Sequence, residues 1–308
     1  MRSYFYFVSS LGSPEKGIKG KYLMIIDFHT HSFPDAIAPK AIDRLSAASD
    51  TKAYTDGTLA GLREGMKAAG IDLSVLMPVV TAPTQHRTIN RVAVEINQKW
   101  QETGVMSFGG IHPDNADYKE ILRHLALAGI RGIKLHPIFQ GCSLDDIRFL
   151  RIIDCACENG LYVLTHAGFD IAFPGVFHAS PPVIRRMYDQ VKPDKLILAH
   201  MGGWGQWQEA EELLLELPVW LDTSTCLTGM EHIRVTNPKE RKFPPEMEQL
   251  SVRDFERMVR KLGAERILMG SDSPWTPQDA SLKAIQKSAL TDKEKGRILG
   301  ENAEKILF

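Results

Sequence analysis

Short apolar runs rich in β-branched residues alternate along the chain with longer stretches in which apolar residues recur every three or four positions. The first pattern predicts buried strands, and the second predicts amphipathic helices, for example over Leu59, Leu62, Met66 and Ala69. Regular alternation of this kind predicts parallel strands joined by helical crossovers. The strand-like runs cover residues 24–28, 73–79, 105–111, 132–136, 161–166, 196–200, 219–222 and 266–270.

Glycines stand where the predicted helices end. Five of them come just before a strand-like run, at the position where a glycine adopts left-handed backbone: Gly70, Gly104, Gly129, Gly160 and Gly263. The polar residues 143–146 predict the start of the helix that ends before Gly160. Eight strand–helix units over residues 24–308 predict an α/β fold, a closed (β/α)8 or TIM barrel forming a single catalytic domain. An open, doubly wound sheet is the alternative.

Two segments depart from this rhythm. Residues 229–249 contain Pro238, Pro244 and Pro245 and predict a long loop over one end of the barrel. In residues 1–23 the apolar run 4–8 is too short to span a membrane, and no signal-peptide cleavage site follows it. Met24 stands directly before the first strand, so our hypothesis is that translation starts there. Residues 1–23 would then be an extension without a role in the fold.

Composition narrows the range of partners. The formal net charge is −1 and charged residues make up 24% of the chain, without a run of lysine or arginine. This argues against nucleic-acid binding and against a membrane-surface protein. The four cysteines are too few and too scattered for a disulfide framework. Reduced, buried thiols in a cytoplasmic protein are the expectation.

Histidines and an aspartate gather at the carboxyl ends of the predicted strands, where barrel enzymes carry their chemistry. The first run leads into His29 and His31; being two apart on a strand, they point to the same side. His166 ends the fifth run, His200 ends the sixth, and Asp272 follows the eighth. Imidazole and carboxylate ligands suit Zn²⁺ or a similar first-row ion, which lowers the pKa of a bound water to about 7. The sequence therefore predicts a metal centre.

Several motifs resemble a known family. These are Asp-x-His-x-His at 27–31, Gly-Ile-Lys-Leu at 132–135, Thr-His-Ala-Gly at 165–168, Ala-His-Met-Gly-Gly at 199–203 and Gly-Ser-Asp-Ser-Pro-Trp at 270–275. Their order from about residue 24 to the end is similar to that of the amidohydrolase superfamily. The resemblance is to the amidohydrolase-related (amidohydrolase 2) branch of metal-dependent TIM-barrel hydrolases and decarboxylases. It implies the fold and superfamily, and leaves the substrate open.

The resemblance also implies roles for individual residues. His29, His31, His166 and Asp272 would be the metal ligands, and Asp272 would also take a proton from the metal water. His200 would act as acid or base beside a single ion, or as a ligand in a two-metal centre. Lys134 lies where two-metal relatives carry a carboxylated lysine bridge, so one ion is favoured and two are expected if Lys134 is carboxylated.

Other residues keep two interpretations. Lys134, if unmodified, orients an acidic substrate or neighbouring groups, and His136 shares its strand face. His112 and His136, each followed by proline, either contact substrate or anchor their loops. Trp275 either forms a pocket wall or packs beneath its loop. Asp222 is left outside the metal set, because similar proteins place a structural polar residue there.

These observations support two enzymatic hypotheses. The first is hydrolysis of a small amide, lactone or ester-like substrate by metal-activated water, with Asp272 or His200 moving the proton. The alternative is metal-dependent, non-oxidative decarboxylation of an aromatic or unsaturated carboxylic acid. A non-catalytic binding barrel is disfavoured, because every expected ligand is present. The expected cofactor is a divalent metal, Zn foremost, with Mn or Fe as alternatives. The expected partners are a small-molecule substrate and a second copy in a homodimer, with no nucleic acid and no membrane.

Overall fold

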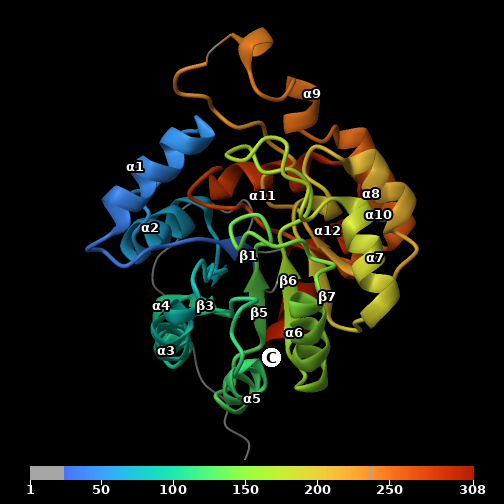
Figure 1. Ribbon diagram of the computed structural model, residues 1–308. Helices are drawn as coiled ribbons and strands as arrows, with labels where there is room; N and C mark the ends of the chain where they lie inside the picture. The colour runs from blue at the N-terminus through green and yellow to red at the C-terminus, as the bar shows by residue number, and fades with distance from the viewer. Residues whose placement is uncertain (1–23, 236) are drawn as a thin grey trace, which may run out of the picture.

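The computed structural model describes residues 24–235 and 237–308. Its parallel strands lie in the middle of the molecule, with the helices around them (Figure 1). The strands are β1 (Ile26–Thr30), β2 (Leu73–Leu76), β3 (Val105–Ser107), β4 (Gly109–Gly110), β5 (Gly132–Leu135), β6 (Tyr162–Thr165), β7 (Leu196–Leu198), β8 (Trp220–Asp222) and β9 (Ile267–Leu268). Neighbours pair in parallel in the orders β1-β2-β3 and β4-β5-β6-β7-β8-β9.

Backbone hydrogen bonds between the first and last strand regions close the ring. The N–H of Phe28 donates to the carbonyl of Met269 at 2.7 Å, and the N–H of Asp272 donates to the carbonyl of His29 at 2.8 Å. An open sheet would leave these groups unpaired at its edges. The predicted (β/α)8 barrel is therefore confirmed, and the doubly wound alternative is wrong.

The helices follow the predicted punctuation. All five glycines predicted to end helices have positive φ, and Asp146 caps α6 by accepting the N–H of Arg148 at 2.9 Å. The helices are α1 (Ala38–Ser49), α2 (Leu59–Ala69), α3 (His86–Asn97), α4 (Trp100–Thr103), α5 (Tyr118–Leu127), α6 (Ile147–Glu158), α7 (Pro181–Val191), α8 (Trp207–Leu213), α9 (Pro245–Glu248), α10 (Val252–Leu262), α11 (Gln278–Lys287), α12 (Asp292–Gly296) and α13 (Asn302–Leu307).

The third predicted strand, 105–111, is divided into β3 and β4. β3 pairs with β2 on one side, and β4 pairs with β5 on the other. At this break, the side chains of two asparagines in α3 make the backbone hydrogen bonds that a neighbouring strand would otherwise make. Asn97 bonds both the N–H and the carbonyl of Ser107, and Asn90 does the same for Gly110. These side-chain bonds keep the backbone satisfied across the break.

The first strand begins two residues later than predicted and contains a register shift between Asp27 and Thr30. The shift separates side chains that simple alternation would place together. Asp27 bonds Ser271 at 2.6 Å and Gln278 of α11 at 2.9 Å. His29 instead meets Lys134 of β5 and Asp222 of β8. The irregularity therefore directs His29 toward the neighbouring strand ends.

Apolar side chains fill the barrel below this level. Phe28, Val75, Phe108, Leu164 and Ile197 belong to one buried cluster, which also includes Ala303, Ile306 and Leu307 of the last helix. A larger cluster lies between the strands and the surrounding helices. Helix α13 thus packs against the apolar core inside the barrel. The polar groups of the site lie at the other ends of the strands.

The predicted loop 229–249 lies at the upper end of the molecule in Figure 1 and includes α9. Lys242 donates from Nζ to the carbonyls of Ala48 and Ile171 at 3.2 and 3.3 Å. The Phe243 ring stacks on Phe169, with centroids 5.4 Å apart. The segment therefore connects α1 with the loop that follows β6, as expected of a loop over the barrel end.

The proposed extension, residues 1–23, lies outside the described residues. All four cysteines are free; Cys142, Cys155 and Cys226 are buried as predicted, whereas Cys157 is half-buried. No helix in the described part of the chain combines the length and apolar character needed to cross a bilayer.

We expect Gly300→Ala to lower the free energy of unfolding by about 2–4 kcal/mol, because a Cβ at Gly300 would lie 1.9 Å from the carbonyl oxygen of Met24. Urea unfolding followed by circular dichroism measures this loss. Gly229→Ala is the control, since its Cβ would meet nothing closer than Gln249 Oε1 at 3.6 Å. Equal stability of the two variants would contradict the expectation.

Candidate metal centre

The carboxyl ends of β1 and β9 bring together two imidazoles and a carboxylate. His29 lies within β1, His31 directly follows that strand, and Asp272 lies in the segment after β9. Asp272 Oδ1 is 2.9 Å from His31 Nε2 and 3.6 Å from His29 Nε2. The three ligand atoms lie within 4.8 Å of one another. The side chains of His31 and Asp272 keep 18% and 13% of their surface exposed, so the group is open to small molecules.

Hydrogen bonds from behind orient this group. Asp222 Oδ2 lies 2.8 Å from His29 Nδ1, so this nitrogen carries the proton and the lone pair is on Nε2. Thr225 donates its hydroxyl to Asp272 Oδ2 at 2.5 Å, which leaves Oδ1 directed at the histidines. Partners of this kind set the tautomer and direction of metal ligands. The donor set therefore fits a divalent cation in its chemistry as well as its position.

A second pair of nitrogens faces each other deeper in the site. His200 Nδ1 lies 2.9 Å from the carbonyl of Ser224, and His166 Nε2 lies 3.0 Å from the carbonyl of Phe169. A carbonyl oxygen can only accept, so these nitrogens carry the protons. The lone pairs of His200 Nε2 and His166 Nδ1 then face each other at 3.1 Å. Such an arrangement is favourable when a cation or a proton lies between them.

The four predicted ligands do not form one group. His166 gathers with His136 and Asp170, whereas His29, His31 and Asp272 form the other group. The ring of His200 lies between them, 5.5 Å from the His29 ring and 4.8 Å from the His166 ring. The single-ion ligand set that includes His166 therefore stays a prediction.

Lys134 of β5 is 1% exposed, and its Nζ lies 3.0 Å from His29 Nε2. Burial lowers the pKa of Lys134 to about 8. The structure thus brings Lys134 into the centre, as the sequence predicted. A bridging carbamate on this lysine stays a prediction.

The protonation states suit metal binding. Burial and the neighbouring Lys134 ammonium lower the pKa of His29 to about 4. Burial also lowers the pKa values of His166 and His200. Burial raises the pKa of Asp272, but the hydrogen bond with His31 and nearby histidine charges outweigh it and hold that pKa well below its usual range. Neutral imidazoles and an ionised carboxylate are the forms that bind metal ions.

Left-handed backbone marks three of the strand ends. His200, Met201, Thr225 and Asp272 have φ between 53° and 66°, a conformation that costs roughly 1–2 kcal/mol per residue for most side chains. Hydrogen bonds hold the strained residues, for example from the Trp207 indole to the carbonyl of His200 at 3.0 Å. Backbone strain of this kind clusters at functional sites.

His136, which the sequence predicted to line the pocket, contacts His166 and Asp170. Its ring stacks on His166 with centroids 4.3 Å apart, and its Nε2 lies 3.5 Å from Asp170 Oδ2. Sequence reasoning missed Asp170, although it lies four residues after His166 in the same loop. Burial raises the pKa of Asp170 to about 6. The sequence did carry a signal for Asp170, namely an acidic residue in the loop that follows a histidine at a strand end.

Two other predicted residues make contacts elsewhere. His112 accepts the N–H of Asp114 on Nδ1 at 3.2 Å, and its own N–H donates to Asn115. These contacts match the loop-anchoring interpretation of His112. Trp275 is half-buried, and its backbone N–H donates to the carbonyl of Asp272 at 2.9 Å. A substrate contact for either side chain stays a prediction.

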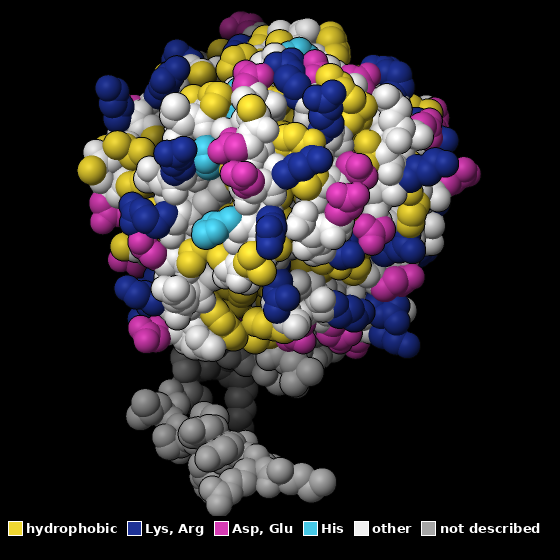
Figure 2. Space-filling view, turned by 60° about the horizontal axis from the view of Figure 1, so that its bottom comes forward, with side chains coloured by type: hydrophobic (Ala, Val, Ile, Leu, Met, Phe, Trp, Pro, Cys, Tyr) yellow, Lys and Arg dark blue, Asp and Glu magenta, His cyan; other side chains and the backbone are white. Residues whose placement is uncertain are grey.

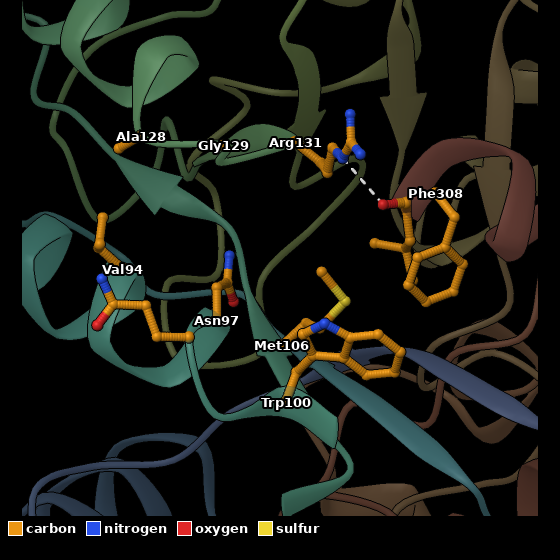
Figure 3. Close-up of a pocket in the computed structure, with 10 residues that line it drawn as sticks. Val94, Asn97, Trp100, Met106, Ala128, Gly129, Arg131 and Phe308 are labelled. Carbon is orange, nitrogen blue, oxygen red and sulfur yellow. Dashed lines mark hydrogen bonds between the residues drawn. The ribbon is translucent and has the colours of Figure 1, made fainter. Parts of the chain in front are cut away.

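A cavity of about 220 Å³ lies at the other end of the barrel (Figure 3). Trp100, Met106 and Phe308 line it, and Arg131 donates to the carbonyl of Leu307 at 2.9 Å. Among the described residues of its lining, Arg131 is the sole ionisable side chain, and no histidine, cysteine, aspartate or glutamate side chain is among them. Figure 2 turns the bottom of the Figure 1 view forward, and on the surface that it shows, positively and negatively charged side chains are interspersed.

A family model described as Amidohydrolase matches residues 26–308. The chain belongs to the amidohydrolase family. A comparison with curated proteins finds no match.

Solved structures similar to this amidohydrolase include decarboxylases and a hydrolase. One is 5-carboxyvanillate decarboxylase from Sphingomonas paucimobilis, 17% identical, covering 92% of this chain and 99% of that one, with a TM-score of 0.63. Another is 5-carboxyvanillate decarboxylase from Novosphingobium aromaticivorans, complexed with manganese and a nitrobenzoic acid, with 15% identity, 95% and 97% coverage and a TM-score of 0.64. A third is a probable 2-pyrone-4,6-dicarboxylic acid hydrolase from Acinetobacter baumannii, with 14% identity, 92% and 99% coverage and a TM-score of 0.58. At these identities the likeness concerns the fold.

We expect Asp222→Asn to weaken divalent-cation affinity by about 10–100-fold, because the orienting carboxylate behind His29 is lost. Calorimetric titration of metal-free protein with Mn²⁺ measures the change, and circular dichroism checks that the variant is folded. Asp194→Asn is the matched control, since Asp194 is largely exposed and pairs with Lys195. Unchanged affinity in a folded Asp222→Asn protein would contradict the orienting role.

Proposed function

We propose that this amidohydrolase is a metal-dependent hydrolase that cleaves a small amide, lactone or ester-like bond. The observation that carries the proposal is the convergence of His29 Nε2, His31 Nε2 and Asp272 Oδ1 beside the facing lone pairs of His166 and His200. Supporting hydrogen bonds leave these donor atoms directed into the site. The manganese bound by a decarboxylase of similar fold supports a divalent cation here. Zn, Mn and Fe all suit this donor set.

His29, His31 and Asp272 would hold the cation. When bound, it supplies a Lewis acid that polarises the scissile carbonyl and activates water. Asp272 Oδ1 accepts a proton from the attacking water and passes it to the leaving group, while Thr225 holds Oδ2. His200 Nε2 is the second group placed to move a proton. Its Nδ1 is held by Ser224, so the ring keeps its orientation as the proton is transferred.

The number of ions depends on Lys134. With an unmodified amine, we propose one ion and a single acid–base histidine, His200. With a carboxylated amine, His166 and His200 would bind a second ion, which their facing lone pairs favour. The two forms differ in metal content and can be separated by measurement.

We expect His29→Ala and Asp272→Ala each to lose the cation and at least about 99% of turnover, because each removes a ligand of the centre. His200→Asn keeps one ion and loses turnover, since the amide cannot move a proton at Nε2. Metal content per chain is measured by inductively coupled plasma mass spectrometry on protein purified without chelators. Full activity in His200→Asn would contradict its role, and full metal content in the alanine variants would contradict the centre.

A second candidate function, decarboxylation, is favoured by the buried cation Lys134 and the aromatic side chains near His136. The Phe139 ring lies 4.5 Å from the His136 ring and 5.1 Å from Phe173. The decarboxylases among the similar structures are in line with this reaction. In that case the site would hold a carboxylated substrate, and His200 or Asp272 would deliver a proton to carbon.

Isotopes distinguish the two reactions. We expect turnover of small amides or lactones in ¹⁸O water to place one ¹⁸O atom in the acid product, as hydrolysis requires. Mass spectrometry of the products measures this, and chelator-treated protein is the control. Carbon dioxide release from an aromatic carboxylic acid, with deuterium from D₂O on the product carbon, would instead establish decarboxylation and overturn the hydrolase proposal.

A further inference from the structure

The wall of the site formed by the ends of β5 and β6 carries a half-buried carboxylate, Asp170, that the hydrolytic mechanism does not use. Asp170 Oδ1 accepts the N–H of Ala172 at 2.8 Å. Its Oδ2 faces His136 Nε2 at 3.5 Å, and about 12% of its side-chain surface stays exposed. Asp170 belongs to the group of possible ligands that includes His136 and His166, and it remains open to a small molecule.

Hydrogen-bonding capacity is left over on this carboxylate. His136 Nδ1 accepts the N–H of Phe139 at 3.5 Å, so its Nε2 carries the proton and lies 3.5 Å from Asp170 Oδ2. The Ala172 N–H fills one of the roughly four positions at which a carboxylate accepts, and the His136 N–H at 3.5 Å is a longer contact. Lys242, the nearby lysine, directs its ammonium at two backbone carbonyls. Among the described residues, the ion-pair contact of Asp170 is with His136.

A row of aromatic rings extends from His136, the neighbour of the carboxylate. His136 stacks on His166, the Phe139 ring meets His136 edge to face, and Phe173 meets Phe139 in the same way. The Phe173 side chain is exposed in the loop after β6. Aromatic faces of this kind accept planar groups. A carboxylate within such surroundings pairs with an N–H donor and repels a second anion.

We propose that Asp170 and His136 form a substrate subsite that takes a planar group rich in N–H donors, such as an amide, amidine or N–H heterocycle, and rejects a second carboxylate. The subsite rests on the proposed function, because it places this group beside the scissile bond at the metal centre. It makes Asp170 a specificity-determining residue. The substrate that Asp170 selects would carry a neutral or cationic N–H donor group where a dicarboxylic acid carries its second carboxylate.

Three probes with the same ring test this charge preference in the full-length, Mn²⁺-loaded protein. 3-Amidinobenzoate, 3-carbamoylbenzoate and isophthalate share one carboxylate that can bind the cation, and they differ in the meta group. Isothermal titration calorimetry measures their dissociation constants. We expect the amidine to bind most tightly and isophthalate at least about tenfold more weakly. In Asp170→Asn the ratio falls to near one, whereas Asp43→Asn on the exposed side of α1 keeps the wild-type order.

The outcomes separate the subsite from the metal centre. Isophthalate binding as tightly as the amidine in wild type overturns the subsite, and so does an unchanged order in Asp170→Asn. If Asp170→Asn fails to fold, His136→Gln takes its place, with a reduced amidine preference expected. Failure of all three probes to bind Mn²⁺-loaded protein also overturns the subsite, while the metal centre stands on its Mn²⁺ content. Absence of Mn²⁺ binding overturns both proposals.

Discussion

The buried carboxylate of Asp222 connects the elements on which the site depends. It is 0% exposed and accepts from the His29 ring, from the N–H of His200 and from the N–H and hydroxyl of Ser224. Burial raises the pKa of Asp222, but the charge and hydrogen bond of His29 outweigh it and hold that pKa well below its usual range. A buried charge is tolerated where it is hydrogen-bonded and paired in this way. One side chain thus positions the ends of β1, β7 and β8 and the tautomer of a candidate ligand.

Closure of the barrel gives this arrangement its rigidity. The last strand region bonds β1 on both sides of His29, through Phe28 and Asp272. The same backbone therefore closes the ring and sets the separation of two candidate ligands. The register shift in β1 sets the direction of the His29 side chain. It turns His29 away from the side on which Asp27 bonds Ser271 and Gln278.

We infer that the choice of substrate depends on the loops around the metal site, whereas the chemistry depends on the strand ends. The similar structures share the fold at 14–17% identity, and both a hydrolase and decarboxylases are among them. The ligand candidates lie at strand ends, whereas Asp170 and Phe173 lie in the loop after β6. Loops carry specificity on a conserved scaffold. The charge of this one wall is therefore a stronger guide to the substrate than the fold is.

The sequence by itself determined the barrel, the strand ends that carry the histidines, and the glycines that end the helices. It could do so because periodicity, strand-end motifs and glycine positions are local signals. Tertiary structure alone decided that the predicted ligands fall into two groups, that Asp222 orients His29, and that Asp170 joins His136. These outcomes depend on contacts between residues far apart in the chain, such as 29 with 222, and on a register shift that no local pattern predicts. Side chains from six strand ends, those of β1, β5, β6, β7, β8 and β9, meet in the site because the closed ring holds these ends at one height.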